Sequence, residues 1–238
     1  MKASTRRSIQ IVLAVLLVAA AARLVFVYNQ RQSPTPLQPA RASEPGALDP
    51  DAYVVPRRVR AFDLNSLQRE VKGKPAWARE GYRYTYYPLR GKGVDWAHEA
   101  GMLGPIERLD IQDVITAPTP GAPNQHDVLL VFSKGGRRFG VPVGVEQRGD
   151  YQIFFDEIFF IQDPRELYKH WPASVWDAVA KHEIREGMNE IQASFAAGMG
   201  VPQPGGGATD KKVHYPNGGH PLLVVYRKGK AVSVATTK

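Results

Sequence analysis

The chain has 238 residues, of which 43% are hydrophobic, 10% aromatic and 23% charged, a composition typical of a globular protein with one or two domains. It contains no cysteine, which excludes disulfides, thiolate catalysis, thiolate metal sites and a lipid anchor on an N-terminal cysteine. Half of the net charge of +8 comes from residues 1–49, which hold six Lys or Arg side chains and only two acidic ones. The other half forms no basic stripe, so we predict no nucleic-acid partner.

Residues 1–28 are predicted to be a signal anchor or a signal peptide. A basic start is followed by an apolar stretch from Ile9 to Tyr28, which only Gln10 and Arg23 interrupt. At about 1.5 Å per residue, a helix of this length crosses a hydrocarbon core of about 30 Å. The basic side should stay in the cytoplasm, so we expect a single-pass inner-membrane protein whose C-terminal domains lie in the periplasm.

Two fates of this leader stay open. The small residues Ala20 and Ala22 offer a cleavage site, and cleavage would leave a secreted or periplasmic protein. An uncleaved anchor would use the whole apolar stretch. We favour the anchor because apolar residues continue beyond Arg23.

Residues 29–60 are Pro-rich and polar and show no hydrophobic period. Such a segment cannot bury enough apolar surface to offset the entropy lost on ordering it. We therefore predict a disordered linker here, with the folded part beginning near Ala61.

Residues 61–162 are predicted to form a small antiparallel β domain with an SH3-like layout. The period-two pattern of strands occurs at residues 82–89, 107–117, 126–143 and 151–161. The second stretch shifts its apolar positions between Ile111 and Val114. The third is expected to be a hairpin that turns at Gly135 and Gly136.

Aromatic side chains in the first part of this domain form a candidate binding surface. We expect Tyr82, Tyr84 and Tyr86 to share one face of a strand near Trp77. Such a strip could stack on sugar rings and bind a glycan such as peptidoglycan. The alternative, which we favour, is that the tyrosines are strand formers that pack against neighbouring strands.

Residues 163–238 are predicted to form a helix–helix–β-hairpin domain. The first helix falls within residues 163–184, with Pro172 at a first helical position and a capping pattern of Ser174 and Asp177. Its predicted apolar face consists of Val175, Trp176, Val179 and Ala180.

A second helix is expected after Gly187. Its predicted apolar stripe consists of Met188, Ile191, Phe195 and Met199. The residues expected to end it are Gly198, Gly200 and Pro202. Strands should follow at residues 211–216 and 220–234, and the last pair should turn at Lys228 and Gly229.

The C-terminal quarter, residues 183–236, contains an ordered motif: I-x-x-G-M-x-x-x-Q, then G-x-P, then strands around a Gly-Lys turn. In this order it resembles the small domain of the SmpA/OmlA family, the lipoprotein subunit of the outer-membrane barrel-assembly machinery. The matching positions are Ile184, Gly187, Met188, Gln192, Gly200, Pro202, Tyr215, Leu223, Val225, Tyr226, Gly229 and Val232.

The resemblance implies an envelope protein whose small α/β domain binds other proteins and assists envelope protein assembly. Two departures limit what it implies. The lipidated cysteine of the family is absent, and a β domain of about 100 residues precedes the match. A specific role in barrel assembly is therefore not carried over.

Catalytic and metal-binding patterns are weak. His182 and Glu183 lack the second histidine that a zinc protease needs one helical turn away. His214 and His220 flank a turn without a third ligand. Asp156 and Glu157 lie in a predicted strand, where adjacent side chains would point apart. We therefore predict no catalytic residue, no metal and no cofactor.

The sequence thus favours a membrane-anchored, extracytoplasmic, non-enzymatic binding or scaffold protein of the bacterial cell envelope, with an envelope protein as partner. One alternative is a glycan-binding module that uses Trp77, Tyr82, Tyr84 and Tyr86. A further alternative is a metal-independent hydrolase whose site would gather His182, Glu183 and His214.

Overall fold

The computed structural model describes Arg23 and residues 49–91 and 93–237. The chain divides into two units, Met1–Asp49 and Pro50–Lys238. Apart from Arg23, the predicted leader lies outside the described residues, and so does most of the predicted linker. In the ranges that the structure describes, no helix is long and apolar enough to cross a membrane.

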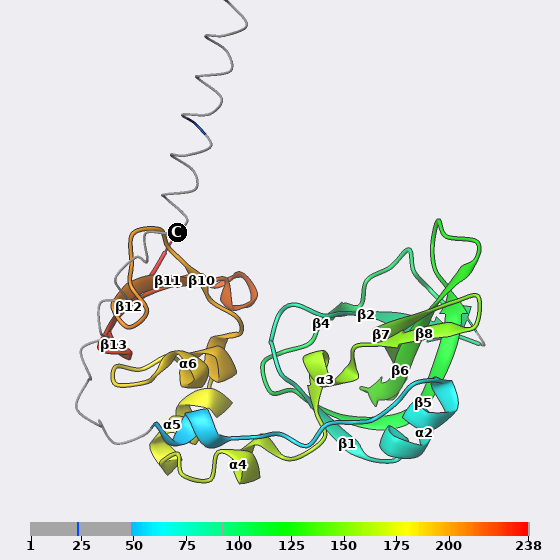
Figure 1. Cartoon of the computed structure of the whole chain (residues 1–238), viewed down its shortest axis with the longest axis horizontal. Helices are drawn as coiled ribbons and strands as arrows, with labels where there is room; N and C mark the ends of the chain where they lie inside the picture. Colours follow the sequence, from blue (N-terminus) through cyan, green and yellow to red (C-terminus); the bar gives the residue numbers. More distant parts are fainter. Residues whose placement is uncertain (1–22, 24–48, 92, 238) are drawn as a thin grey trace, which may run out of the picture. The chain divides into compact units, whose positions relative to one another are not determined.

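Within the second unit the chain forms two antiparallel sheets with a few short helices, which confirms the α+β class (Figure 1). The larger sheet has the strand order β3-β2-β7-β6-β5-β1-β9, with β4 paired to β2 and β8 paired to β7. Its strands are β1 (Pro75–Ala78), β2 (Thr85–Arg90), β3 (Gly93–Val94), β4 (Gly101–Met102), β5 (Arg108–Pro118), β6 (Gln125–Lys134), β7 (Arg137–Gln147), β8 (Asp150–Ile153) and β9 (Phe159–Phe160).

The central strands follow the sequence pattern closely. On β5, Leu109, Ile111 and Val114 are all buried, and a register shift lies between Ile111 and Asp113, as predicted. The hairpin of β6 and β7 turns at Gly135 and Gly136, whose φ angles are 58° and 74°. A two-residue turn that needs positive φ at both positions favours glycine there.

Helix α2 (Leu64–Val71) covers one side of the larger sheet and was not predicted. Asp63 caps its N-terminus by accepting a hydrogen bond from the backbone N–H of Ser66 at 2.7 Å. Leu67 and Val71, one helical turn apart, are fully buried in the core of the sheet.

The strand predicted at residues 151–161 is wrong in its second half. After β8 the chain forms a single helical turn, α3 (Phe155–Ile158), before the short β9. The buried side chains Phe155, Ile158 and Phe159 are spaced i, i+3 and i+4. The turn places Phe155 and Ile158 on one side, whereas a strand would point these two side chains to opposite faces, and Phe159 then begins β9.

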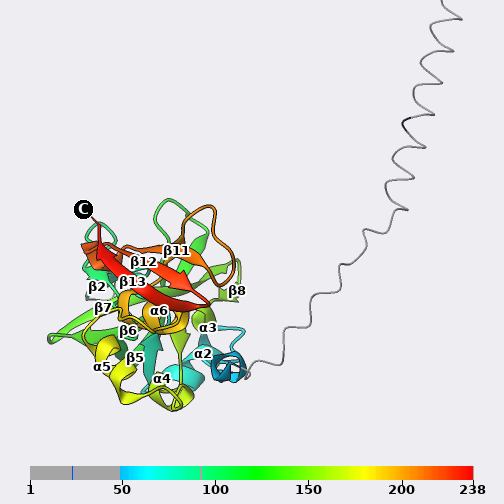
Figure 2. The ribbon, with the colours of Figure 1, turned by 90° about the vertical axis from the view of Figure 1, so that its left-hand side faces the viewer.

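The smaller sheet has the strand order β10-β11-β12-β13. Its strands are β10 (Val201–Pro202), β11 (Lys211–Tyr215), β12 (Leu222–Arg227) and β13 (Lys230–Thr236), and a 3-10 turn, η2 (Asn217–Gly219), joins β11 to β12. The helices are α4 (Pro164–Leu167), α5 (Ala173–Ala180) and α6 (Glu190–Ala197). Helix α6 lies against one face of this sheet, and both share a core with α5 (Figure 2).

Two details of the predicted helices are wrong. Pro172 is the N-cap of α5, and no side-chain capping bond forms there. The buried face of α6 differs from the predicted stripe, because Ile191 is 38% exposed and Met199, which lies beyond the end of the helix, is 48% exposed. The side chains of α6 that are buried are Gln192, Ala193, Phe195, Ala196 and Ala197. Small alanines let the helix approach its neighbours closely, so its core face is wider than the spacing of large side chains indicates.

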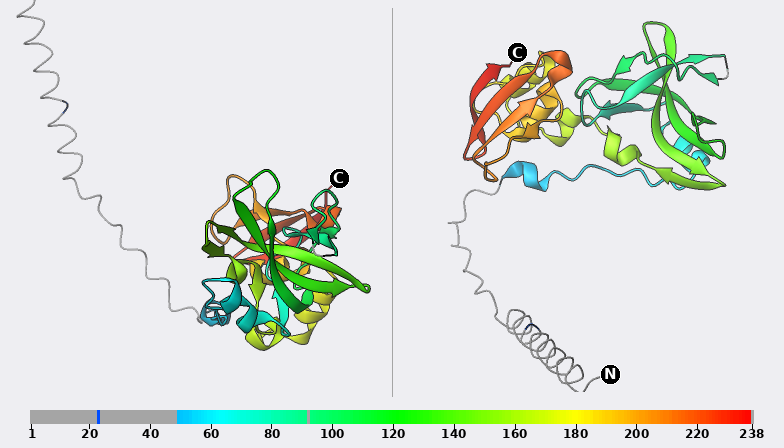
Figure 3. Two further views of the ribbon diagram at one scale, coloured as in Figure 1. Left: turned by 90° about the vertical axis from the view of Figure 1, so that its right-hand side faces the viewer. Right: turned by 90° about the horizontal axis from the view of Figure 1, so that it is seen from above.

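The folded unit begins at Pro50, earlier than the predicted boundary at Ala61. Residues 50–59, here called the strap, start with a 3-10 turn, η1 (Pro50–Tyr53). The strap then runs from the side of α5 past α3 toward α2 (Figures 1 and 3). Its buried members are Asp51 and Val59, so this part of the predicted linker is not a free tether.

Candidate binding site

The first end of the strap is held by Asp51, whose side chain is only 3% exposed. Its carboxylate accepts hydrogen bonds from Trp171 Nε1 at 2.7 Å and Asn189 Nδ2 at 2.6 Å, and lies 2.5 Å from His170 Nε2. Burial alone would raise the pKa of Asp51. The hydrogen bonds from His170, Asn189 and Trp171 overcome that effect and hold the pKa below its ordinary value.

The second end of the strap is held by the larger sheet. Val59 is 8% exposed and belongs to the core of that sheet. Its N–H donates to Asp156 Oδ1 at 2.8 Å, and the N–H of Arg57 donates to Gln162 Oε1 at 2.7 Å. The strap is therefore attached to the helices at one end and to the β core at the other.

Between these attachments a cleft of about 540 Å³ opens beside the strap, here called the strap cleft. Its volume lies in the range usual for ligand-binding clefts, roughly 300–1,000 Å³. One wall consists of strap residues Val54–Arg58, and the opposite wall consists of Arg79, Ile153, Phe154, Asp156, Glu157 and Phe159.

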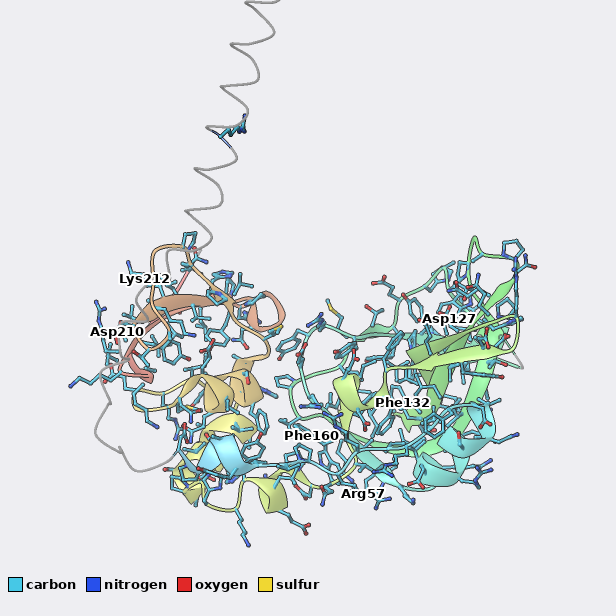
Figure 4. All side chains as sticks on the ribbon, in the orientation of Figure 1. Arg57, Asp127, Phe132, Phe160, Asp210 and Lys212 are labelled. Atoms are coloured by element: carbon cyan, nitrogen blue, oxygen red, sulfur yellow. The ribbon has the colours of Figure 1, made fainter. Side chains whose placement is uncertain are left out.

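Three guanidinium groups line the strap cleft, and they are held to different degrees. Arg79 is fixed, because its Nη1 donates to the backbone carbonyl of Asp156 and its Cζ lies 4.7 Å from the ring centroid of Phe160. Arg57, labelled on the strap in Figure 4, pairs with Glu70 at 3.0 Å. Arg58 is exposed. Within the described part of the chain, no carboxylate forms an ion pair with Arg58 or Arg79.

Asp156 and Glu157 also line this cleft, so the prediction that they diverge on a strand is wrong. They belong to the helical turn α3, which allows both side chains to face the same space. Asp156 is engaged by the N–H of Val59, while Glu157 is exposed. The strap cleft therefore contains charged groups of both signs together with apolar side chains. It was missed in the sequence analysis because residues 50–59 were predicted to belong to the linker.

The predicted aromatic strip is not formed as expected. Strand β2 begins only at Thr85, so Tyr82 and Tyr84 precede it. Tyr86 is 7% exposed and packs edge-on against Phe132 and Phe139, with ring centroids 5.5 Å and 5.2 Å apart. A ring enclosed in this way offers no face to a sugar.

The other aromatic candidates are partly buried. Tyr84 packs against the core of the larger sheet, and Trp77 packs against the core shared by the helices and the smaller sheet. Both side chains therefore pack against a core, but Tyr84 precedes the strand, so only Tyr86 packs against neighbouring strands as the alternative interpretation predicts.

Tyr82 lies where the two sheets of the unit meet. Its backbone is left-handed, with φ of 60°. A Cβ added to Gly218 would come within 2.7 Å of its ring, and one added to Gly198 would come within 2.6 Å of the carbonyl oxygen of Gly81. Glycines at these two positions thus permit the close contact of residues 81–82 with the C-terminal part.

The positions that match the SmpA/OmlA motif serve packing and turns. Gly187 has φ of 86°, and its N–H donates to the carbonyl of Ala231 at 2.8 Å. Met188 is 3% exposed. Gln192 is buried and forms a capping box with Asn189 at the start of α6.

The remaining motif positions lie on the smaller sheet or beside it. A Cβ on Gly200 would come within 2.4 Å of Val213, and Pro202 pairs with Val213 in the sheet. Tyr215 is fully buried, and its hydroxyl lies 2.8 Å from that of Tyr226. Burial raises the pKa of Tyr226 to about 12 and raises that of Tyr215 further.

The histidines considered for catalysis or metal binding do not form a cluster. His182 Nδ1 lies 3.1 Å from the carbonyl oxygen of Ala196, and Glu183 pairs with Arg185 at 2.6 Å. His214 lies on β11, and His220 follows η2. Over residues 49–91 and 93–237, no group of three His, Asp or Glu side chains could hold a metal ion.

Comparisons with known proteins gave no match. No family model, no curated protein and no solved structure matches this chain.

Proposed function

We propose that this chain is a membrane-anchored, extracytoplasmic, non-enzymatic binding protein of the bacterial cell envelope, and that it holds an envelope protein in the strap cleft. The observation that carries the proposal is the cleft itself. It combines a fixed guanidinium, an exposed guanidinium and two carboxylates with apolar walls, on a segment attached at both ends.

This combination suits binding. Attachment at Asp51 and Val59 keeps the strap in place, so a partner does not have to order it. Charges of both signs select a complementary surface, and the apolar walls add contact area. Membrane attachment in this proposal rests on the pattern of residues 1–28, and the strap is the N-terminal segment of the unit Pro50–Lys238.

We also propose that residues 61–162 form an SH3-like domain and residues 163–238 an SmpA/OmlA-like domain. After the single turn α4, the order α5, α6, β10, β11, β12, β13 supports the second assignment, since the resemblance implies two helices followed by antiparallel strands. The burial of Met188, Gln192 and Tyr215 also supports it.

Photo-cross-linking tests the proposed function. A photoreactive benzoylphenylalanine replaces Val55, which lines the strap cleft and is 83% exposed. The matched control places it at Val232 on β13, which is 46% exposed. Full-length protein is irradiated in cells of its native host, and the adducts are identified by mass spectrometry.

We expect one envelope protein to be captured reproducibly at Val55 and not at Val232. Equal capture at both positions, or capture of nothing at Val55, would contradict the proposal. Recovery of muropeptides at Val55 instead of a protein would also contradict the proposal, because it would make the strap cleft a glycan-binding site.

A further inference from the structure

We infer that the strap cleft recognises an acidic peptide segment, with one carboxylate of the peptide bound by Arg58 and Arg79 and an apolar residue in contact with apolar side chains of the cleft. This inference rests on the proposed function, and it adds the chemical class of the partner's segment.

The guanidinium groups give the first reason. A guanidinium has five N–H donors in a rigid fork that matches a carboxylate. Arg79 uses Nη1 for the backbone carbonyl of Asp156, and its Cζ lies 4.7 Å from the centroid of the Phe160 ring. Other donors of this group remain for a ligand, since no carboxylate of the described residues pairs with it.

The charged groups that line the cleft favour a carboxylate ligand over a phosphate. The cleft is lined by Arg57, Arg58 and Arg79 and by Asp156 and Glu157, and Glu70 pairs with Arg57, so Arg58 and Arg79 are the two lining guanidinium groups without a carboxylate partner among the described residues. A carboxylate fits between these two groups and adds only one negative charge beside Asp156 and Glu157. A phosphate group carries about −1.5 to −2 at neutral pH, and its second charge would face the two carboxylates.

The apolar side chains of the cleft point to a peptide and not to a free small acid. Val55 on the strap and Phe154 on the opposite wall are 83% and 38% exposed, so both side chains are open to contact. A peptide presents alternate side chains at a spacing that lets one reach the guanidinium groups while the next covers these apolar side chains. A small carboxylic acid would leave them uncovered.

The inference is tested on the full-length protein in dodecyl maltoside micelles by NMR of the arginine Nε–Hε groups. The probes are acetyl-Leu-Glu-Leu-amide, its uncharged counterpart acetyl-Leu-Gln-Leu-amide, and inorganic phosphate. The resonances of Arg58 and Arg79 report on the cleft, and that of Arg227, an exposed arginine on β12, is the control.

The acidic probe should shift Arg58 and Arg79 in a saturable way, and the neutral probe should bind at least about tenfold more weakly. Arg58→Gln should weaken binding of the acidic probe by a similar factor, while Arg227→Gln should leave that binding unchanged. Arg58 is exposed, so Arg58→Gln should leave the rest of the spectrum intact.

Three results would overturn the inference: equal binding of the neutral probe, a response to phosphate without one to the acidic probe, or no saturable shift. In each case, an envelope protein captured at Val55 would preserve the proposed function, and only the assigned ligand class would fall.

Discussion

At the scale of single residues, Asp51 joins the strap to the helical part. Its carboxylate replaces water with three donors from two other segments, and such charge-assisted hydrogen bonds are each worth about 1.5–3 kcal/mol. Because its folded pKa lies below the ordinary 3.8, its contribution to stability is present above the unfolded pKa. That contribution is lost as the pH falls through the folded pKa.

We expect Asp51→Asn to lower the free energy of unfolding by about 2–3 kcal/mol at pH 7. The variant should also lose part of the decline in stability that the native protein shows below about pH 4. Urea unfolding at several pH values, followed by tryptophan fluorescence, measures both effects. Asp127→Asn on β6 is the control, because no hydrogen bond or ion pair of its side chain is present within the described residues (Figure 4). Equal stability of the two variants would show that the attachment at Asp51 contributes nothing.

Gly218 and Gly219 form a matched pair at the junction around Tyr82. Both have positive φ, at 60° and 97°, but only a Cβ on Gly218 would meet the Tyr82 ring. Both alanine variants should carry a backbone strain of about 1–2 kcal/mol, and Gly218→Ala should cost about 1–3 kcal/mol more. The added cost should disappear in a Tyr82→Ala background when unfolding free energies are compared. If Gly218→Ala lowers the free energy of unfolding equally with Tyr82 and with Ala at that position, the Tyr82 ring does not limit the space at Gly218.

At the scale of elements, the sequence predicts best where a strand has one buried face. Strand β5 alternates between buried and exposed side chains, and even the shift between Ile111 and Asp113 is visible in the sequence. Strands β6 and β7 bury consecutive side chains, and their hairpin was predicted from the turn at Gly135 and Gly136. Elements whose packing comes from distant residues were missed or misread. The strap has no period, and its key contact joins Asp51 to His170, 119 residues further along the chain. No local signal in residues 50–60 could reveal it.

Helix α6 shows the same limit on a smaller scale. The stripe of large apolar residues was predicted correctly at Met188 and Phe195 but not at Ile191 or Met199. The helix buries its alanines on a different arc and ends before Met199. Phe195→Ala should therefore lower the free energy of unfolding by about 3–5 kcal/mol, and Ile191→Ala should lower it by less than about 1 kcal/mol. Urea unfolding of the two variants measures the difference. Similar losses of unfolding free energy in the two variants would instead support the apolar stripe predicted from the sequence.

At the scale of the whole molecule, the strap unites the folded unit and forms one wall of its charged cleft. The strap is attached to the helices through Asp51 and to the β core through Val59. Of the residues considered in the sequence analysis for catalysis or metal binding, only Asp156 and Glu157 line the strap cleft, because α3 places both beside the strap.

The central claim is that the strap cleft captures a partner through its arginines. It is tested most directly by the yield of the Val55 adduct in cells when Arg58→Glu and Arg79→Glu are introduced together. Arg227→Glu with Arg185→Glu serves as the matched charge control, and native-like unfolding of the cleft variant is checked first. We expect the adduct to be lost in the cleft variant and retained in the control. An undiminished adduct in a folded cleft variant would contradict the claim.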